Sequence, residues 1–168
     1  KVLNEKYNNQ ERISVYVKQL DTDRVAAIND EKSMYAASVA KLGVLYYAQE
    51  RLSQKKLSLS DEYQYTAAVN GFPGAYDPDG SGKISKMPDD KNYSLENLLK
   101  AVAQNSDNVA TNILGYYVTN QYDKAFQKSV DKAAATSWNM DKKELTARAA
   151  GTLMEAVYRQ NGDIITYL

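Results

Sequence analysis

Residues 33–52 read SMYAASVAKLGVLYYAQERL, and the rest of the chain can be arranged around them. Apolar side chains on nearly all sides predict a buried core helix, yet Lys41 lies in its middle. A lysine in such surroundings needs a chemical reason, and Ser38 stands three residues earlier on the same helix face. Because desolvation disfavours an ammonium ion, we expect Lys41 to lose its proton easily and to activate the Ser38 hydroxyl as a nucleophile.

Length and composition limit the class of protein. A chain of 168 residues is long enough for a sizeable core and short for two, so residues 1–168 are expected to form a single domain. Lysine plus arginine equals aspartate plus glutamate at 21 each, so neither nucleic acid nor an anionic membrane is an expected partner. The absence of cysteine and histidine excludes disulfides, thiolate catalysis and the commonest base and metal ligand of hydrolases. No apolar run approaches the roughly 18 residues of a membrane span.

The N-terminal part predicts a β-hairpin. Over residues 12–20, Ile13, Val15 and Val17 alternate with polar side chains, so these three are expected on the buried face of a strand. A turn and a returning strand at residues 25–28 complete the hairpin, which leads into the expected core helix.

The rest of the chain predicts an irregular stretch and several helices. Seven glycine or proline residues between residues 67 and 90 indicate a long surface connection. Ser94 is a good helix N-cap, and Asp141 with Glu144 resembles a capping box. Helices are therefore expected over residues 95–102, 109–117, 122–135 and 141–159, the last closed by Asn161 and Gly162, while residues 1–10 are expected to be frayed or helical.

The pattern Ser-x-x-Lys occurs three times, and the surroundings distinguish the copies. Ser53 with Lys56 lies in a solvated charged run and Ser129 with Lys132 on a charged helix, so neither offers a dry site for an activated nucleophile. Only the copy within residues 33–52 has apolar surroundings. Its alternative interpretation is a small serine at a helix start and a lysine extended outward to solvent.

A second motif, Ser106-Asp107-Asn108, lies between two predicted helices. As structure it is a helix N-cap, because all three residue types cap well. As chemistry it supplies a hydroxyl that can pass a proton, and an amide that can hold both a lysine and a substrate carbonyl. Taken alone, the motif favours the cap.

Together the two motifs, in this order, resemble the signature of the class A β-lactamases and their penicillin-binding relatives. Residues 13–42, ISVYVKQLDTDRVAAINDEKSMYAASVAKL, are similar to the family's first hairpin entering its nucleophile helix. Residues 93–114 are similar to its central helices, and residues 140–160 to the helix after its active-site loop. The resemblance implies an α+β fold of the β-lactamase/transpeptidase type, with an N-terminal antiparallel hairpin and a helical subdomain.

Carried over residue by residue, the resemblance implies that Ser38 is the acylated nucleophile and Lys41 its general base or proton relay. Ser106 would donate a proton to the leaving nitrogen, and Asn108 would contact both the substrate and Lys41. Asp107 would be structural, and the backbone N–H of Ser38 would form half of an oxyanion hole. The resemblance implies no metal and no cofactor.

Two departures from the family pattern limit what the resemblance implies. The family's active-site loop carries a glutamate that activates the deacylating water. In this sequence the only glutamates after Ser106 are Glu144 and Glu155, and both lie on the predicted helix. Deacylation is therefore expected to be slow. The family's Lys-Thr/Ser-Gly strand does not occur in the sequence, so we expect the front part of a domain whose C-terminal sheet strands are absent from this chain.

Residues 77–84, DPDGSGKI, imitate the start of a calcium-binding EF-hand loop. The twelfth position, where a bidentate glutamate belongs, is Pro88, and flanking helices are not expected. We therefore interpret the segment as a glycine-rich turn and expect no metal site.

The expected function is that of a secreted or cell-envelope serine hydrolase that forms an acyl-enzyme with β-lactams and hydrolyses them, which would confer antibiotic resistance. Two alternatives stay open: a penicillin-binding or transpeptidase-like protein that deacylates slowly, and a non-catalytic envelope protein that binds peptidoglycan or a partner. The expected small-molecule partners are β-lactams or peptidoglycan peptides. The free edge of the strand at residues 12–20 is also expected to pair with a C-terminal fragment or with a second copy of the chain.

Overall fold

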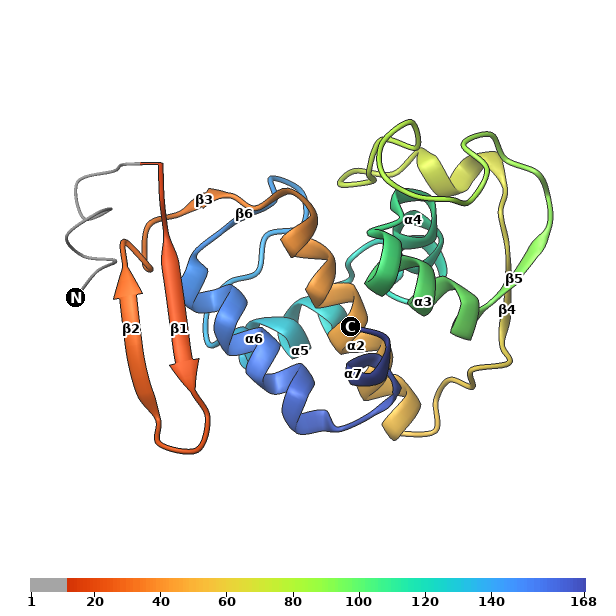
Figure 1. Ribbon diagram of the computed structural model, residues 1–168. Coiled ribbons are helices and arrows are strands. Elements are labelled where there is room, and N and C mark those ends of the chain that lie inside the picture. Colours follow the sequence, from red (N-terminus) through yellow and green to blue (C-terminus); the bar gives the residue numbers. More distant parts are fainter. Residues whose placement is uncertain (1–11) are drawn as a thin grey trace.

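The computed structural model describes residues 12–168, in which the helices lie between a hairpin and an irregular connection (Figure 1). The predicted hairpin and the helical part after it are confirmed. The segment at residues 1–10, expected to be frayed or helical, lies outside the described residues. The elements in chain order are β1 (Val15–Gln19), β2 (Arg24–Ile28), β3 (Met34–Tyr35), η1 (Ala37–Lys41), α2 (Leu42–Ser53), β4 (Glu62–Gln64), η2 (Ala67–Asn70), β5 (Asn92–Ser94), α3 (Leu95–Asn105), α4 (Asn108–Tyr117), α5 (Lys124–Ala134), β6 (Glu144–Leu145), α6 (Ala147–Gln160) and α7 (Asp163–Tyr167).

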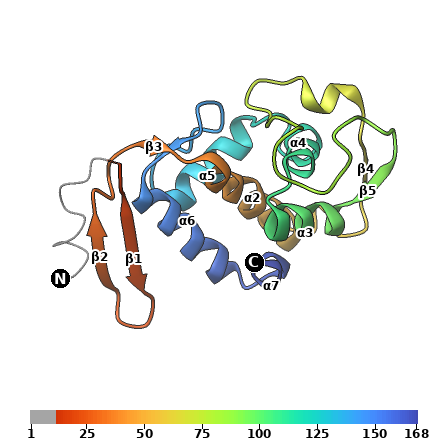
Figure 2. The same cartoon turned by 45° about the horizontal axis from the view of Figure 1, so that its top comes forward.

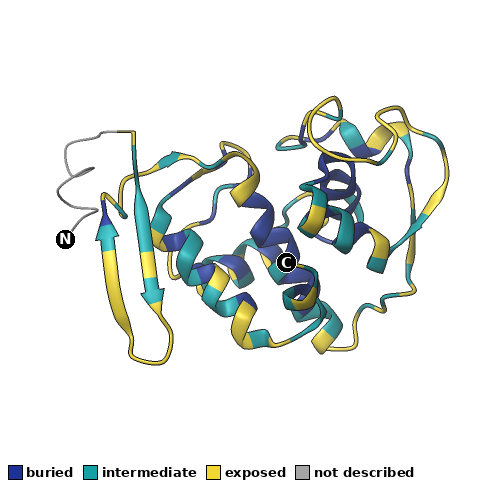
Figure 3. Ribbon diagram, in the orientation of Figure 1, coloured by how far each residue is buried: buried dark blue, intermediate teal, exposed yellow. Residues whose placement is uncertain are grey.

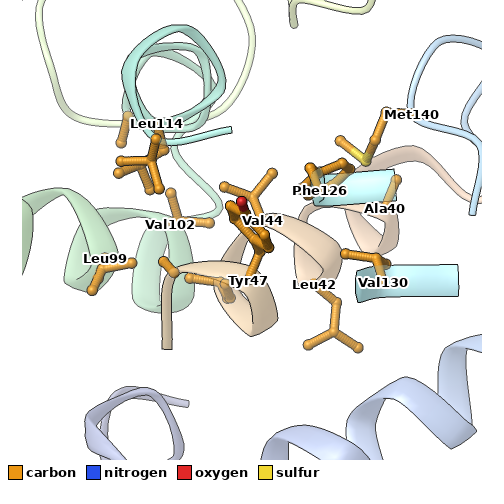
Figure 4. Packing of buried hydrophobic residues seen from close by; sticks show 14 of the residues in the cluster. Ala40, Leu42, Val44, Tyr47, Leu99, Val102, Leu114, Phe126, Val130 and Met140 are labelled. Carbon is orange, nitrogen blue, oxygen red and sulfur yellow. The ribbon is translucent and has the colours of Figure 1, made fainter. Parts of the chain in front are cut away.

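Helix α2 is the centre of the core. In two views α3 and α4 lie on one side of it, and α5 and α6 on the other (Figure 1, Figure 2). Figure 4 shows Val44 and Tyr47 of α2 between Leu99 and Val102 of α3 and Phe126 of α5. Burial of one such side chain typically contributes about 1.5–3 kcal/mol, so these contacts fix both helix pairs relative to α2.

The helix predicted over residues 33–52 begins later than expected. The segment Ala37–Lys41 is a 3₁₀ turn, η1, and α2 starts only after it. Val39, expected among the buried apolar side chains, is 50% exposed. Apolar periodicity does not distinguish a 3₁₀ turn from an α-helix over so few residues. Ser38 and Lys41 still share one face, because residues i and i+3 are eclipsed in a 3₁₀ turn.

The predicted hairpin is an antiparallel pair of β1 and β2, but its predicted buried face is wrong. Val17 is 53% exposed, whereas Lys18 Nζ on the other face donates to Glu155 of α6 at 2.9 Å. Tyr16 also lies against α6, where a Cβ on Gly151 would come within 2.4 Å of its ring. Long amphipathic side chains pack through their stems, so alternation alone did not show which face a helix covers. Figure 3 shows that both strands stay exposed or half-buried over most of their length.

The helix predicted over residues 141–159 also starts later. Thr146, whose Oγ1 accepts a helix N–H at 3.0 Å, is the N-cap of α6. Asp141 and Glu144 do not form the expected capping box, because Glu144 lies in β6, which pairs antiparallel with β3. The predicted end is confirmed, with Asn161 as a left-handed C-cap at φ 47°.

The connection over residues 67–90 is irregular, as predicted, apart from the 3₁₀ turn η2. It is not purely a surface feature, since Val69, Phe72 and Tyr76 are buried. Strands β4 and β5 pair antiparallel at its two ends, and the sequence pattern missed them because three residues are too few to show alternation. Over residues 12–168, none of the helices is both long and apolar enough to cross a membrane.

Candidate active site

Ser38 lies exposed on the turn η1, in a backbone that is strained and held from two sides. Ala37 before it has φ 47°, a left-handed conformation that costs a non-glycine residue on the order of 1 kcal/mol or more. The Ala37 carbonyl accepts a hydrogen bond from the Tyr76 hydroxyl at 3.2 Å, and the Ala36 N–H donates to the Lys143 carbonyl at 2.7 Å. Neighbouring segments therefore fix the turn that presents Ser38.

Lys41 is buried at the start of α2, with 2% of its surface exposed. Its Nζ donates to the Ser106 carbonyl at 2.5 Å, to Ser106 Oγ at 3.1 Å and to Asn108 Oδ1 at 2.5 Å. Burial lowers the pKa of Lys41 to about 8, the Asp107 carboxylate opposes this shift, and the Lys143 ammonium adds to it. With such a pKa, about a tenth of the Lys41 side chains are neutral amines at pH 7.

The break between α3 and α4 brings Ser106 and Asn108 to this amine. Ser106 is the C-cap of α3 and has a left-handed backbone, with φ 51° and ψ 40°. Asp107 then caps α4, where its Oδ1 accepts the Ala110 N–H at 2.9 Å. The cap therefore involves Asp107, while the residues on either side of it contact Lys41.

Residues 77–84 pack against Asp107 and Asn108 and hold both residues by hydrogen bonds. Asp107 Oδ2 accepts the N–H groups of Lys83 at 2.6 Å and Ile84 at 2.9 Å. Both oxygens of this buried carboxylate are thus committed to backbone donors. The structural role expected for Asp107 corresponds to this geometry, which joins the irregular connection to the start of α4.

The glycines of residues 77–84 are needed for close approach to the motif. A Cβ on Gly80 would lie 2.3 Å from Asn108 Nδ2, and one on Gly82 would lie 2.5 Å from the Asp107 carboxylate. Gly82 also has φ 138°, which side chains rarely permit. Asn108 Nδ2 donates to the Asp77 carbonyl at 2.7 Å, so the segment orients the amide that holds Lys41.

Ser38, Lys41 and Ser106 line one cavity of about 220 Å³. The remaining lining side chains are apolar: Val39, Leu42, Leu45, Val102, Ala103, Met154 and Leu168. Among the described residues, no hydrogen bond joins Ser38 to either partner. The structure thus brings the lysine together with Ser106 and Asn108, and places Ser38 in the same cavity.

Two residues near Lys41 were missed by sequence reasoning. The ring of Tyr76 has the Lys41 Nζ 4.6 Å from its centroid and the Lys143 Nζ 4.5 Å from it. Tyr76 lies in the glycine- and proline-rich stretch that we expected at the surface, and Lys143 follows another lysine in the helix expected over residues 141–159. Nothing in the local sequence pattern could have identified them.

The chain matches the model of the beta-lactamase enzyme family over residues 1–167. It therefore belongs to this family, whose members are serine hydrolases, and the family expected from the sequence is confirmed. No curated protein is similar enough in sequence to be matched to the chain.

Solved structures of the same fold include penicillin-binding proteins and a β-lactamase. The chain is similar to PBP-A (TM-score 0.74, 15% identity), to penicillin binding protein 5 from Haemophilus influenzae (0.71, 18%) and to the beta-lactamase from Sphaerobacter thermophilus DSM 20745 (0.66, 18%). The matches cover 97%, 86% and 87% of this chain, but 61%, 44% and 55% of those chains. The expected α+β fold is thus confirmed, for a chain that spans less than two thirds of these structures.

Proposed function

We propose that the protein forms a covalent acyl-enzyme on Ser38 with β-lactams, and with peptidoglycan peptides in the same way. The observation that carries this proposal is the buried Lys41 amine, which is hydrogen-bonded to Ser106 Oγ at 3.1 Å in the cavity that Ser38 also lines. Membership of the family supports the reaction class. A mutant of the similar PBP-A has a structure as an acyl-enzyme complex with penicillin G, which supports the choice of β-lactams.

In the proposed acylation, Ser38 Oγ attacks the lactam carbonyl carbon while its proton passes to the neutral amine of Lys41. The carbonyl oxygen becomes an oxyanion, which the backbone N–H of Ser38 stabilises. As the lactam C–N bond breaks, Ser106 gives its hydroxyl proton to the leaving nitrogen and regains one from Lys41. The serine proton therefore ends on the nitrogen, and the acyl group ends as an ester on Ser38.

Asn108 has two roles in this proposal. Its Oδ1 accepts one N–H of the neutral Lys41 amine while the Ser106 carbonyl accepts the other, which leaves the single lone pair of the amine for the serine proton. One N–H of its Nδ2 is held by the Asp77 carbonyl. We assign the second N–H to the carbonyl of the substrate side chain.

We propose that the acyl-enzyme persists, so that the protein behaves as a penicillin-binding protein rather than as a rapid hydrolase. Asp107 has both oxygens bound by backbone N–H groups. Glu155 is paired with Lys18 and Arg159, and Glu144 is exposed on β6. We infer that none of these carboxylates activates a water at the ester, and loss of one general base typically slows a step about 10²- to 10⁴-fold.

The test is intact-mass spectrometry after incubation with a labelled penicillin, on protein carrying every residue that its gene encodes. The unaltered protein should gain one penicillin mass, and Ser38→Ala and Lys41→Ala should not. Ser53→Ala is the matched control, because it removes the serine of a second Ser-x-x-Lys pattern on an exposed position. Labelling that survives Ser38→Ala refutes the assignment. A folded, unlabelled protein would favour the non-catalytic envelope protein instead.

Persistence is tested in the same experiment by removing free penicillin and following the acyl-enzyme mass. The proposal expects it to remain over many minutes, whereas a return to the free mass within seconds would show that another group activates water.

We further propose that the protein is secreted or acts in the cell envelope, because β-lactams and peptidoglycan peptides are met there. Fractionation of cells with an antibody to the protein tests this location.

A further inference from the structure

Lys143 is a second buried amine beside the proposed site. It is 9% exposed, and its Nζ donates to the Gly74 carbonyl at 3.1 Å. Its Nζ lies 4.5 Å from the centroid of the Tyr76 ring, and the Lys41 Nζ lies 4.6 Å from the same point. The two nitrogens are therefore at most 9.1 Å apart, which is the two ring distances added. A buried pair of like charges at this range is screened less than a pair at the surface.

The Tyr76 ring, which both amines approach, is fixed in place. The backbone N–H of Tyr76 donates to Asn112 Oδ1 at 2.7 Å, and its carbonyl accepts from Asn112 Nδ2 at 2.8 Å. The Tyr76 hydroxyl donates to the Ala37 carbonyl, next to Ser38. Lys143 is tied to the same turn through its own carbonyl, which accepts the Ala36 N–H. The geometry between the two amines is thus set by the fold and not by flexible surface chains.

Two carboxylates act on the pair, and each favours the charged form of one lysine. The Asp107 carboxylate faces Lys41 and favours its ammonium form, while Asp141 does the same for Lys143. Burial raises the pKa of the Tyr76 phenol and of the nearby Tyr122 phenol, so both stay uncharged. Lys143 is therefore the only cation among the described residues that acts on Lys41 against Asp107.

Resting on the proposed acylation of Ser38, we propose that Lys143 is a positioning residue that favours the neutral, proton-accepting form of Lys41 by charge repulsion, with both amines beside the Tyr76 ring. Burial is the largest cause of the lowered Lys41 pKa, and the Lys143 ammonium adds to it. Burial lowers the pKa of Lys143 as well, and Asp141 counteracts this shift. The proposal requires Lys143 to stay protonated while Lys41 loses its proton. The regulation of Lys41 by a second lysine makes the rate of acylation at neutral pH depend on both.

The first test is the pH profile of the acylation rate with a labelled penicillin. In Lys143→Met the midpoint of the rise should move upward by roughly 0.3 to 1 pH unit, the shift expected at the largest possible separation of 9.1 Å in a medium between protein and water. The rate below the midpoint should then fall about 2- to 10-fold, with the plateau at high pH unchanged. Lys143→Arg should restore the midpoint, and Lys142→Met, on the exposed neighbour, should leave it unaltered.

A midpoint that stays in place in Lys143→Met, or moves downward, overturns the proposal. An acylation rate that falls by the same factor at every pH, without a shift of the midpoint, would mean that Lys143 only supports the structure. Lys143→Gln, which keeps a polar group near the Gly74 carbonyl, replaces Lys143→Met if circular dichroism shows that the latter does not fold.

A second measurement separates this inference from the proposed function. NMR titration of ¹³Cε-labelled lysines reports the pKa of Lys41 directly, whether or not Ser38 reacts. Loss of the Lys143 charge should raise this pKa by the same fraction of a unit in the protein without substrate. If the pKa rises but no penicillin is bound, the proposed function fails and the interaction of the two lysines stands. If penicillin is bound and the pKa does not change, only the role of Lys143 is refuted.

Discussion

The indole of Trp138 lies directly against Gly43, so closely that a Cβ on Gly43 would be 2.6 Å from its Nε1. The same Nε1 donates to the Ala40 carbonyl at 3.2 Å, inside the turn that carries Ser38 and Lys41. Trp138 is fully buried, so its ring has no room to withdraw. The first turn of α2 is therefore positioned by a side chain from the segment between α5 and β6.

Gly43→Ala is expected to destabilise the protein, although alanine is the better helix former. The added methyl group must displace the Trp138 ring, and overpacking of this kind typically costs about 1–3 kcal/mol. Urea unfolding followed by tryptophan fluorescence measures the change, because Trp138 is the single tryptophan. Gly71→Ala is the matched control, since its Cβ would meet nothing closer than 3.7 Å. Equal stability of both variants would contradict the packing argument.

The stability of the protein is expected to depend on pH through Lys41. Its pKa is about 8 in the folded chain and near 10.5 in the unfolded one, so between these values the unfolded chain binds more protons. Stability contributed by Lys41 therefore rises with pH across this window, with a slope approaching about 1.4 kcal/mol per pH unit. Relative to Lys41→Met, the unaltered protein should gain free energy of unfolding from pH 8 to pH 10.5, as measured by denaturant titration. Parallel curves for the two proteins would show that Lys41 titrates normally.

Gly82→Ala is expected to damage the proposed site more than the fold. The new methyl group would collide with the Asp107 carboxylate, and the alanine would have to adopt the φ of 138° that Gly82 has. Displacement of residues 77–84 should disturb Asn108 and slow acylation by penicillin, at a cost in stability of about 1–3 kcal/mol. Ser81→Ala, which leaves the backbone carbonyl that accepts the Asn108 N–H, should do neither. Acylation of Gly82→Ala at the unaltered rate would count against the role given to residues 77–84.

The free edge of β1 is expected to pair with another strand. Among the described residues β1 has one neighbour, β2, and Val17 and Val25 expose large apolar side chains on the hairpin. Such an edge recruits a further strand, from a C-terminal fragment or from a second copy of the chain. Light scattering and hydrogen exchange on the 168-residue chain provide the test. A monomer that unfolds cooperatively while its β1 amides exchange freely would show that the helices form a self-sufficient core.

Several parts of the site could be predicted because their signals are local. Ser38 and Lys41 stand in an apolar run, and Ser106 and Asn108 lie in a helix break whose caps are visible in the sequence. Each pair keeps its spacing whatever the tertiary fold does. The resemblance to a family then rested on the order of the two motifs and on the similarity of residues 13–42, 93–114 and 140–160.

The remaining features depend on contacts between distant segments. Lys143 is buried beside Gly74 and Tyr76, which lie about 70 residues earlier in the chain, and the two-residue strand β6 that follows it leaves no periodic pattern. The covered face of β1 was mispredicted because Tyr16 and Lys18 meet partners on α6 that the strand itself does not reveal. Asp141 and Thr146 are both good N-caps in sequence. Thr146 begins α6 because Glu144 and Leu145, between the two, form β6 and pair with β3.

Residues 77–84 also determine where the protein can accept extra chain. This segment is attached at Asp107 and Asn108, so an inserted peptide there would pull apart the two caps between α3 and α4. Met87, a few residues on, is 77% exposed, and lengthening a loop at such a point costs little closure entropy. An epitope or a reporter domain inserted at Met87 is therefore expected to disturb the site less than the same insertion within residues 77–84.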